Sequence, residues 1–316
     1  MISRQAILAA VCFAILGAAG ASLTPAEAAV RAPGFGPLRT SPDAKAKALV
    51  YVSEFYTSTI DIFDQKGRGQ TRIGTLTTGV SFPGGLFVDS DGNLWVANET
   101  SVGTGYILEF APGATTPTQT IQQPSGYALA TKLWRRSDGT LYVVDVTTYG
   151  GGYVLEYVPS TQTWTYLLDT NLIFETGIVG DSEGNVYAAG LNAQGAEVDV
   201  LKSGSSQWEN TNISVPYETG ELAIDAKGNL VVADPFTQTI QTFKHGSGQA
   251  INTIACPGGC TDIAFDRSGT RIWNVVASTE PTVQEFTYPA GRLLDTVNVT
   301  QGSEPFGIAA SPSLYP

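Results

Sequence analysis

The chain has 316 residues, with 17 basic and 29 acidic side chains, a formal net charge of −12 and a single histidine. This acidic balance argues against nucleic acid and anionic membrane surfaces as partners. It suits a cation or a cationic ligand, and it also improves solubility.

The first 28 residues have the pattern of an export signal. Arg4 precedes an apolar run over residues 6–16, and residues 26–28, Ala-Glu-Ala, place small side chains at a cleavage position. The apolar run is shorter than the about 20 residues that cross a bilayer, so no membrane span is expected. The sequence therefore predicts a signal peptide over 1–28 and a secreted or periplasmic protein.

Residues 29–46 contain three prolines and are predicted to form an N-terminal arm, followed by one domain over 47–316. The single domain is expected because one repeat, 41 to 47 residues long, fills nearly all of it. Each repeat has a turn that resembles Asp-x-x-Gly-Asn, and the turn glycines are Gly92, Gly139, Gly184, Gly228 and Gly269. A repeat of this length is typical of propellers and solenoids.

Each repeat contains short runs rich in Val, Ile and aromatic residues, which predict an all-β fold. The run before the turn predicts an innermost strand, and the runs after the turn predict the second and third strands. The innermost strands are expected over 85–89, 177–181, 222–225 and 262–266.

The two ends of the chain complete one repeat between them. Residues 49–54 match a second strand and 59–63 a third strand, while the missing innermost strand occurs at 306–311. An open solenoid leaves these incomplete ends unexplained. The sequence therefore predicts a six-bladed β-propeller of four-stranded blades, in which the C-terminal strand completes the N-terminal blade.

Two cysteines follow the export signal, Cys256 and Cys260, in the run Cys-Pro-Gly-Gly-Cys. An exported protein meets oxidising conditions, so a local disulfide is predicted. A metal site needs more sulfur or histidine ligands, and the only histidine, His245, lies in a polar turn. A catalytic dithiol is the weaker alternative.

Residues 83–98 read Pro-Gly-Gly-Leu-Phe-Val-Asp-Ser-Asp-Gly-Asn-Leu-Trp-Val-Ala-Asn and resemble the NHL repeat, as residues 220–234 do nearly as well. The resemblance covers about 49–311. It implies a six-bladed propeller of the broad group that includes gluconolactonase-like calcium enzymes, paraoxonase-like lactonases and streptogramin lyases. The lyases and the paraoxonase-like enzymes are expected to use central histidines. His245 lies outside the predicted innermost strands, so histidine-dependent chemistry is not expected.

Acidic residues gather where ligands usually enter a propeller, at the face on which the innermost strands begin and the second strands end. The candidate ligand-binding residues at the starts of innermost strands are Glu175, Glu218, Glu221, Asp262 and Glu304. The second strands end at Glu54, Asn98, Asp145 and Asp234. Glu175 and Glu218 both occur in an aromatic-Glu-Thr-Gly run, which the repeat itself does not require.

Oxygen ligands from several strands suit Ca²⁺, which accepts six to eight of them in loose geometry. The candidate metal ligands are Glu175, Glu218, Asp262, Asp145, Asp234 and Asn98. The gluconolactonase-like relatives hold a metal with Glu, Asn and Asp from different blades, although no single ligand is matched here. Asn98, Asp145 and Asp234 also belong to the repeat, where such residues commonly cap the next turn.

Two functions agree with these features. The first is a monomeric binding protein that takes a small molecule or a protein partner at the acidic mouth, without turnover. The alternative is a Ca²⁺-dependent hydrolase, most plausibly a lactonase. In it the ion polarises an ester carbonyl while a carboxylate such as Glu175 or Asp262 activates water. A purely structural role is a third reading, and the sequence leaves open whether the protein is an enzyme.

Overall fold

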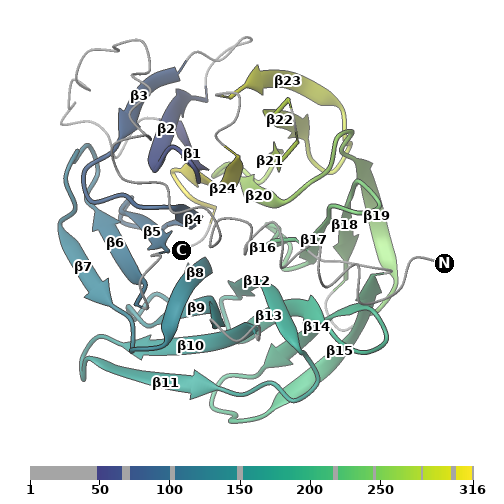
Figure 1. Cartoon of the computed structure of the whole chain (residues 1–316). Coiled ribbons are helices and arrows are strands. Elements are labelled where there is room, and N and C mark those ends of the chain that lie inside the picture. The colour runs from purple at the N-terminus through teal and green to yellow at the C-terminus, as the bar shows by residue number, and fades with distance from the viewer. Residues whose placement is uncertain are drawn as a thin grey trace. The chain divides into compact units, whose positions relative to one another are not determined.

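The protein is described by a computed structural model (Figure 1). The described residues are 48–65, 72–99, 104–147, 152–215, 220–244, 247–278, 280–299 and 304–314. The predicted signal peptide and arm, as well as Glu218 and His245, lie outside these ranges.

The described residues form six sheets, each of four antiparallel strands. The innermost strands are β24 (Pro305–Ser311), β4 (Pro83–Val88), β8 (Tyr127–Arg135), β12 (Phe174–Gly180), β16 (Leu222–Ile224) and β20 (Asp262–Phe265). The second strands are β1 (Leu49–Glu54), β5 (Leu94–Asn98), β9 (Leu141–Thr147), β13 (Val186–Leu191), β17 (Leu230–Asp234) and β21 (Arg271–Val276).

The outer two strands of each sheet complete the blades, which we number one to six from the blade that contains β1. The third strands are β2 (Thr59–Asp64), β6 (Tyr106–Phe110), β10 (Gly152–Val158), β14 (Ala196–Leu201), β18 (Thr239–Phe243) and β22 (Thr282–Thr287). The outermost strands are β3 (Arg72–Leu76), β7 (Gln119–Gln122), β11 (Thr163–Leu167), β15 (Trp208–Val215), β19 (Ala250–Ala255) and β23 (Leu293–Asn298).

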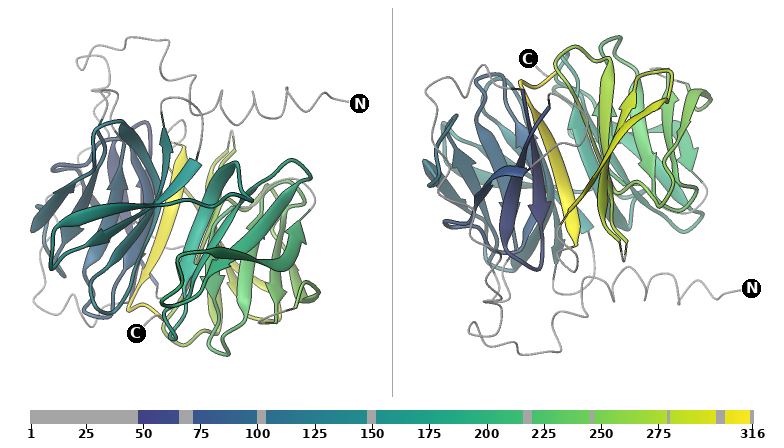
Figure 2. Two further views of the ribbon diagram at one scale, coloured as in Figure 1. Left: turned by 90° about the horizontal axis from the view of Figure 1, so that it is seen from below. Right: turned by 90° about the horizontal axis from the view of Figure 1, so that it is seen from above.

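The first blade is closed as the sequence predicts. Its sheet has the order β24-β1-β2-β3, and β24 pairs antiparallel with β1 from Leu49 opposite Ser311 to Glu54 opposite Pro305. Each innermost strand also contacts the innermost strands of both neighbouring blades. Figure 2 shows β24, in yellow, running through the depth of the propeller beside the strands of the first blade. The fold is therefore an all-β six-bladed propeller.

The repeated turns have the chemistry that the sequence indicates. Asp89 Oδ1 accepts hydrogen bonds from the backbone N–H groups of Asp91, at 3.0 Å, and Asn93, at 2.9 Å. Gly92 adopts φ of 84°, a region that favours glycine over residues with a Cβ atom. The same carboxylate also accepts the indole N–H of the buried Trp95, which ties the turn to the blade core.

The innermost strands are apolar on both faces because blades cover them on both sides. All six residues of β4 are buried, and so are six of the seven residues of β24, all except Phe306. Trp95 and Trp273 lie in the core, as predicted. Among the described residues, no helix is long and apolar enough to cross a membrane.

Candidate functional site

The mouth of the propeller is the end at which the innermost strands begin and the second strands end. Five residues lie at the same position of the repeat, at or near the ends of their second strands and one in each of five blades, and they are Glu54, Asn98, Asp145, Gly190 and Asp234. Four of these five are acids or amides, and all four are fully buried. The repeat therefore directs a ring of polar groups to the mouth.

Two members of this ring cap local backbone. Asp234 Oδ1 accepts the backbone N–H groups of Phe236, at 3.0 Å, and Thr237, at 2.9 Å. Asn98 Oδ1 accepts the backbone N–H of Ser81 at 2.8 Å. Both side chains therefore stabilise local backbone, which is the role that the sequence analysis gave as the alternative to metal binding.

Asp145 is contacted by a side chain, and one of its oxygens is unsatisfied, as Asp234 Oδ2 also is among the described residues. Asp145 Oδ2 accepts a hydrogen bond from the amide of Gln123 at 2.9 Å, whereas the buried Oδ1 has no hydrogen-bond partner among the described residues. Burial raises the pKa of Asp145 to about 7, against the lowering effect of the Gln123 hydrogen bond. The neighbouring Glu99, from the end of the second blade's β5, is also buried, and burial and the charge of Asp145 raise its pKa well above the ordinary value.

In the fourth blade the acid comes from the innermost strand instead. Glu175 lies opposite Gly190 in the β12–β13 pairing and is 2% exposed. A Cβ atom on Gly190 would lie 3.0 Å from the Glu175 Cα, so the glycine accommodates this strand. Glu175 Oε2 is buried and has no hydrogen-bond partner among the described residues. Burial raises the pKa of Glu175 to about 8.

Three tyrosine rings of the third blade pack together near the mouth. The rings of Tyr127 and Tyr153 are edge to face with centroids 6.5 Å apart, and those of Tyr153 and Tyr166 are 5.0 Å apart. Burial raises the pKa of Tyr166 to about 12, and the charges of Tyr153 and Glu175 add to this increase. Tyr153 lies opposite Asp145 in the β9–β10 pairing, so its side chain is on the same face of the third blade as that carboxyl group.

Two predicted candidates lie deeper, on the axis of the propeller, where they meet a cation that the sequence analysis missed. Lys132 Nζ of β8 is 2.7 Å from Asp262 Oδ2 and 3.7 Å from Glu221 Oε2. It also donates to the carbonyl of Phe306 at 3.3 Å and lies 4.9 Å from the centre of that ring. The ammonium group is 4% exposed, so the cluster is closed to bulk solvent.

The two carboxylates of this axial cluster also bind backbone of other blades. Glu221 Oε1 accepts the N–H of Ile178 in the fourth blade at 2.9 Å, and Asp262 Oδ2 accepts the N–H of Ile308 in the first blade at 3.2 Å. A cavity of about 40 Å³ lies beside the cluster and is lined mainly by apolar residues of the innermost strands. The cluster therefore joins blades across the axis.

The last predicted candidate, Glu304, lies at the start of the first blade's innermost strand and is half-buried. Its φ of 51° and that of Phe82, 41°, are left-handed values at corresponding positions, each directly before a proline. Residues other than glycine rarely adopt this conformation, and such strain is common at binding sites. Phe55 packs between Phe82 and Phe306, with ring centroids 5.4 and 6.1 Å away.

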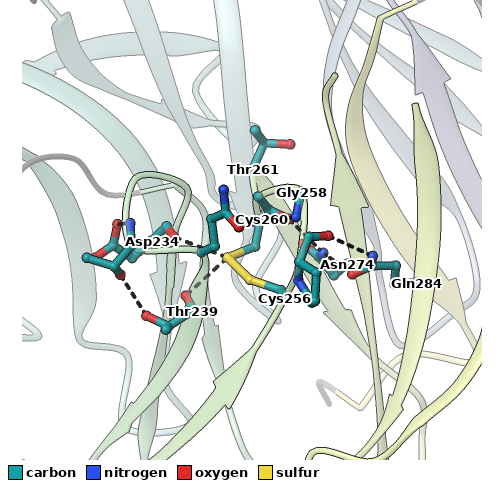
Figure 3. Close-up of a disulfide and its surroundings, with 12 residues drawn as sticks. Asp234, Thr239, Cys256, Gly258, Cys260, Thr261, Asn274 and Gln284 are labelled. Carbon is teal, nitrogen blue, oxygen red and sulfur yellow. Dashed lines mark hydrogen bonds between the residues drawn. A yellow bond between two sulfur atoms is a disulfide. The ribbon is translucent and has the colours of Figure 1, made fainter. Parts of the chain in front are cut away.

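The disulfide prediction is confirmed, and the bonded pair lies on the loop that leads into β20 (Figure 3). Cys256 and Cys260 are both fully buried. The loop between them is also held by side chains, since Asn274 donates to the Gly259 carbonyl at 3.1 Å and Gln284 to the Pro257 carbonyl at 2.9 Å. This loop ends two residues before Asp262, so it positions one acid of the axial cluster.

Several of the candidate calcium ligands that the structure describes are engaged in other contacts. No three His, Cys, Asp or Glu side chains of the described ranges come together as a metal-binding group. Asp262 is already neutralised by Lys132, and Asp234 and Asn98 cap backbone. Glu218, the remaining predicted ligand, lies outside the described residues.

Asp145, Glu175 and Glu99 have no cationic partner among the described residues. The ion pairs of the described residues involve acids elsewhere, namely Asp61, Asp89, Asp138, Glu209, Glu221, Asp262 and Glu285. Asp145, Glu175 and Glu99 occur in none of them. Unpaired carboxyl groups in a low-dielectric site attract either protons or a cationic ligand.

A second hollow lies between the third and fourth blades. It is a groove of about 1370 Å³ that reaches the turns between the first two strands of the third, fourth and fifth blades, with Arg136, Asp138 and Asp181 in its wall. Tyr166 and Leu168 also line it. The turns lie at the end of the propeller opposite the mouth.

None of the protein-family models matches the sequence, so the resemblance to the NHL repeat stays a prediction. No curated protein matches it either. Solved structures do match the fold. A chain from a nidogen/laminin complex is 14% identical with a TM-score of 0.68, over 84% of this chain and 98% of that one.

Two bacterial structures are also similar. TolB from Acinetobacter baumannii has a TM-score of 0.65 at 14% identity, covering 87% of this chain and 69% of its own. Virginiamycin B lyase from Staphylococcus aureus has a TM-score of 0.53 at 13% identity, covering 71% of this chain and 73% of its own. At these identities the similarity establishes the propeller fold alone.

Proposed function

We propose that this protein is an exported binding protein that takes a small ligand at the mouth of its propeller. The observation that carries the proposal is the pair of buried oxygens, Asp145 Oδ1 and Glu175 Oε2, that lack partners among the described residues. Buried polar atoms are nearly always hydrogen-bonded. A ligand that donates hydrogen bonds supplies what these two carboxyl groups lack.

A thermal-shift screen with separate sets of amines, sugars, carboxylates and lactones tests this proposal, because a ligand that binds only the native state raises its melting temperature. Hits are then repeated on the double variant Asp145→Asn/Glu175→Gln. We expect the shift to be lost in this variant and retained in Asp138→Asn, which alters the groove wall. Hits that survive the double variant but are lost in Asp138→Asn move the binding site to the groove and overturn the proposal.

A hydrolase is the second candidate. The pKa of Asp145 is raised to about 7 and that of Glu175 to about 8, and a general base works best with a pKa near the working pH. In this version one carboxylate takes a proton from water as the water oxygen attacks the carbonyl carbon of a lactone. The acyl C–O bond then breaks, and the carboxyl group returns the proton to the departing ring oxygen, which gives the hydroxy acid. Ring opening of δ-valerolactone, followed by proton release, tests it, and activity unchanged in both single variants counts against it.

The calcium-dependent form of this hydrolase is tested separately. The melting temperature is measured in EDTA and across a Ca²⁺ titration, in the wild type and in Glu175→Gln. A rise that the variant abolishes supports a metal at the mouth. A melting temperature that does not change with Ca²⁺ contradicts the calcium-dependent hydrolase but not the proposed binding protein.

Export is the remaining part of the proposal. It is supported by the apolar run and the small residues of positions 6–28. Mass spectrometry of the protein recovered outside the cytoplasm should give a mature N-terminus at Ala29. Recovery of the full-length chain in the cytoplasm alone contradicts it.

A further inference from the structure

We propose that the cavity on the propeller axis is a water-binding site, in which one water molecule bridges Lys132 Nζ and Glu221 Oε2. This inference concerns the interior of the propeller and does not rest on the ligand proposed for the mouth. It assigns a ligand to a cavity that the proposed function leaves without one.

The charged side chains of this site come from one level of the innermost strands. The position four residues before each turn holds, from the first blade to the sixth, Gly307, Gly85, Lys132, Gly177, Glu221 and Asp262. A Cβ atom on Gly85 would lie 2.8 Å from the Lys132 Cα and 3.1 Å from its Cδ. The glycine therefore leaves room for the lysine side chain, which reaches from the third blade to Asp262 of the sixth.

Two polar atoms of the cluster lack a complete set of direct hydrogen bonds. Lys132 Nζ has three N–H groups, and it donates to Asp262 Oδ2 at 2.7 Å and to the Phe306 carbonyl at 3.3 Å. Glu221 Oε2 is 3.7 Å from Nζ, which is longer than the roughly 2.7–3.2 Å of an N–H···O hydrogen bond. Among the described residues this oxygen has no hydrogen bond, whereas Oε1 accepts the backbone N–H of Ile178.

Such a separation is the usual sign of a bridging water. Buried polar atoms are nearly always hydrogen-bonded, and polar groups more than about 3.5 Å apart are commonly joined through water. A water molecule that accepts from Lys132 and pairs with Glu221 completes both groups. It would also join the third blade to the fifth, as the direct ion pair joins the third to the sixth.

The size of the cavity fits water and excludes larger ligands. It has a volume of about 40 Å³, and Glu221 and Asp262 line it together with residues from the innermost strands of all six blades. Ser313, which follows β24, also lines it. A buried water needs about 10 to 15 Å³ of such space, so the cavity holds about three.

The charges of the cluster favour a neutral ligand over an ion. Burial raises the pKa of Glu221 to about 8, although the positive charge of Lys132 opposes this increase. A protonated Glu221 leaves Lys132 balanced by its direct partner Asp262, so no further ion is needed. Water has both donors and acceptors, and it can therefore pair with Glu221 in either protonation state.

Crystal structures of the mature protein, with and without xenon under pressure, test the site directly. A dry apolar cavity takes up xenon, whereas a hydrated polar one retains its water. We expect a water peak within hydrogen-bonding distance of both Lys132 Nζ and Glu221 Oε2, and no xenon beside them. Xenon in the cavity, or no water that contacts both atoms, overturns the inference.

Magnetic relaxation dispersion of the water oxygen gives a second test in solution, because it counts long-lived internal waters. Glu221→Leu removes the polar partner and should lose about one such water relative to the wild type. Glu221→Gln keeps a polar group and should retain it. Glu209→Leu makes the same change as Glu221→Leu on the exposed strand β15 and should leave the count unchanged.

The variants also have a defined negative result. Equal counts of long-lived water in the wild type and in folded Glu221→Leu overturn the inference, as does the loss of a water in Glu209→Leu alone. Glu221→Leu leaves the ion pair of Lys132 with Asp262 in place, so it should fold. The crystal structures of the wild type test the site independently of how well this variant folds.

Discussion

Replacing Lys132 with methionine should destabilise the propeller more than any other single loss of a charged side chain among the described ion pairs. Lys132 Nζ is 2.7 Å from Asp262 Oδ2 and 3.7 Å from Glu221 Oε2, and it donates to the Phe306 carbonyl. Methionine fills a similar volume without the charge. The variant therefore leaves two buried carboxyl groups on the axis with no counter-charge.

The size of the loss follows from that burial. Removing one partner of a buried ion pair costs about 3 to 5 kcal/mol, because the remaining charge is left uncompensated. Burial already raises the pKa values of Glu221 and Asp262, and the positive charge of Lys132 opposes that increase. Without the lysine both carboxyl groups hold protons more strongly in the folded state. The loss of stability is then largest near pH 8 and shrinks as the pH falls toward about 4, where the unfolded chain is protonated as well.

Urea denaturation at pH 8 and pH 5 measures both quantities through the midpoint and slope of the transition. Adding Asp262→Asn to the lysine variant should restore part of the stability at pH 8, since it removes one of the unpaired acids. The control is Lys202→Met, whose partner Glu209 lies at 2.6 Å on the surface and contributes at most about 1 kcal/mol. A decrease of less than about 1 kcal/mol in the free energy of unfolding at pH 8 for Lys132→Met would refute the conclusion that the cluster joins blades across the axis.

Three further predictions concern other parts of the fold. Because Asp145 and Glu175 keep their protons to about pH 7 and pH 8 when folded, native stability should fall as pH rises from about 4 to 8. Each raised pKa accounts for a decrease of up to roughly 4 kcal/mol in the free energy of unfolding over this pH range. Denaturation curves of Asp145→Asn and Glu175→Gln should be flatter in pH, and unchanged curves contradict the raised pKa values. Replacing Cys256 and Cys260 with serine should cost about 2 kcal/mol, the loop-closure term for so short a loop; a melting temperature insensitive to both substitution and reductant argues against it. Gly85→Ala should lower the free energy of unfolding by about 1 to 3 kcal/mol because its Cβ atom would lie 2.8 Å from the Cα atom of Lys132. A melting temperature equal to that of the wild type would show that β4 and β8 can move apart without loss of stability.

The fold was predictable because the same turn residues and apolar strand patterns recur in each repeat. The Asp-x-x-Gly turn needs an acceptor at its first position and a positive φ at its glycine, and Asp89 and Gly92 meet both requirements. The shared first blade was also predictable, because residues 49–54 and 306–311 each lacked the strand that the other supplies. Both predictions depend on local pattern and on counting strands.

The axial cluster was only half predicted. Glu221 and Asp262 were expected at the mouth, but Lys132 was missed because the third blade has Arg136 in place of the turn aspartate and breaks the pattern. Counting four residues back from each turn's first position would have found it. In all six blades this position holds either a charge or a glycine, and the residues are Lys132, Glu221, Asp262, Gly85, Gly177 and Gly307.

The mouth itself was beyond sequence reasoning for a physical reason. Asp145 accepts the side-chain amide of Gln123, whereas Asp234 at the same position of the repeat caps local backbone, and the repeat itself does not distinguish the two roles. The carboxyl group of Glu175 in the fourth blade lies beside Gly152 of the third blade. Comparing the repeats with one another shows neither which side chains are buried nor which residues of different blades come into contact.

The pairing of β24 with β1 also governs when the protein can fold. These strands are about 250 residues apart in the chain, so the ring of innermost strands stays open during synthesis until the last of them is available. Until then the apolar edge of the sixth blade and that of the first blade both face solvent, and contacts so distant in sequence form slowly. A chain exported before this pairing forms would therefore cross the membrane without a closed ring, and closure would take place in the compartment where Cys256 and Cys260 can also be oxidised.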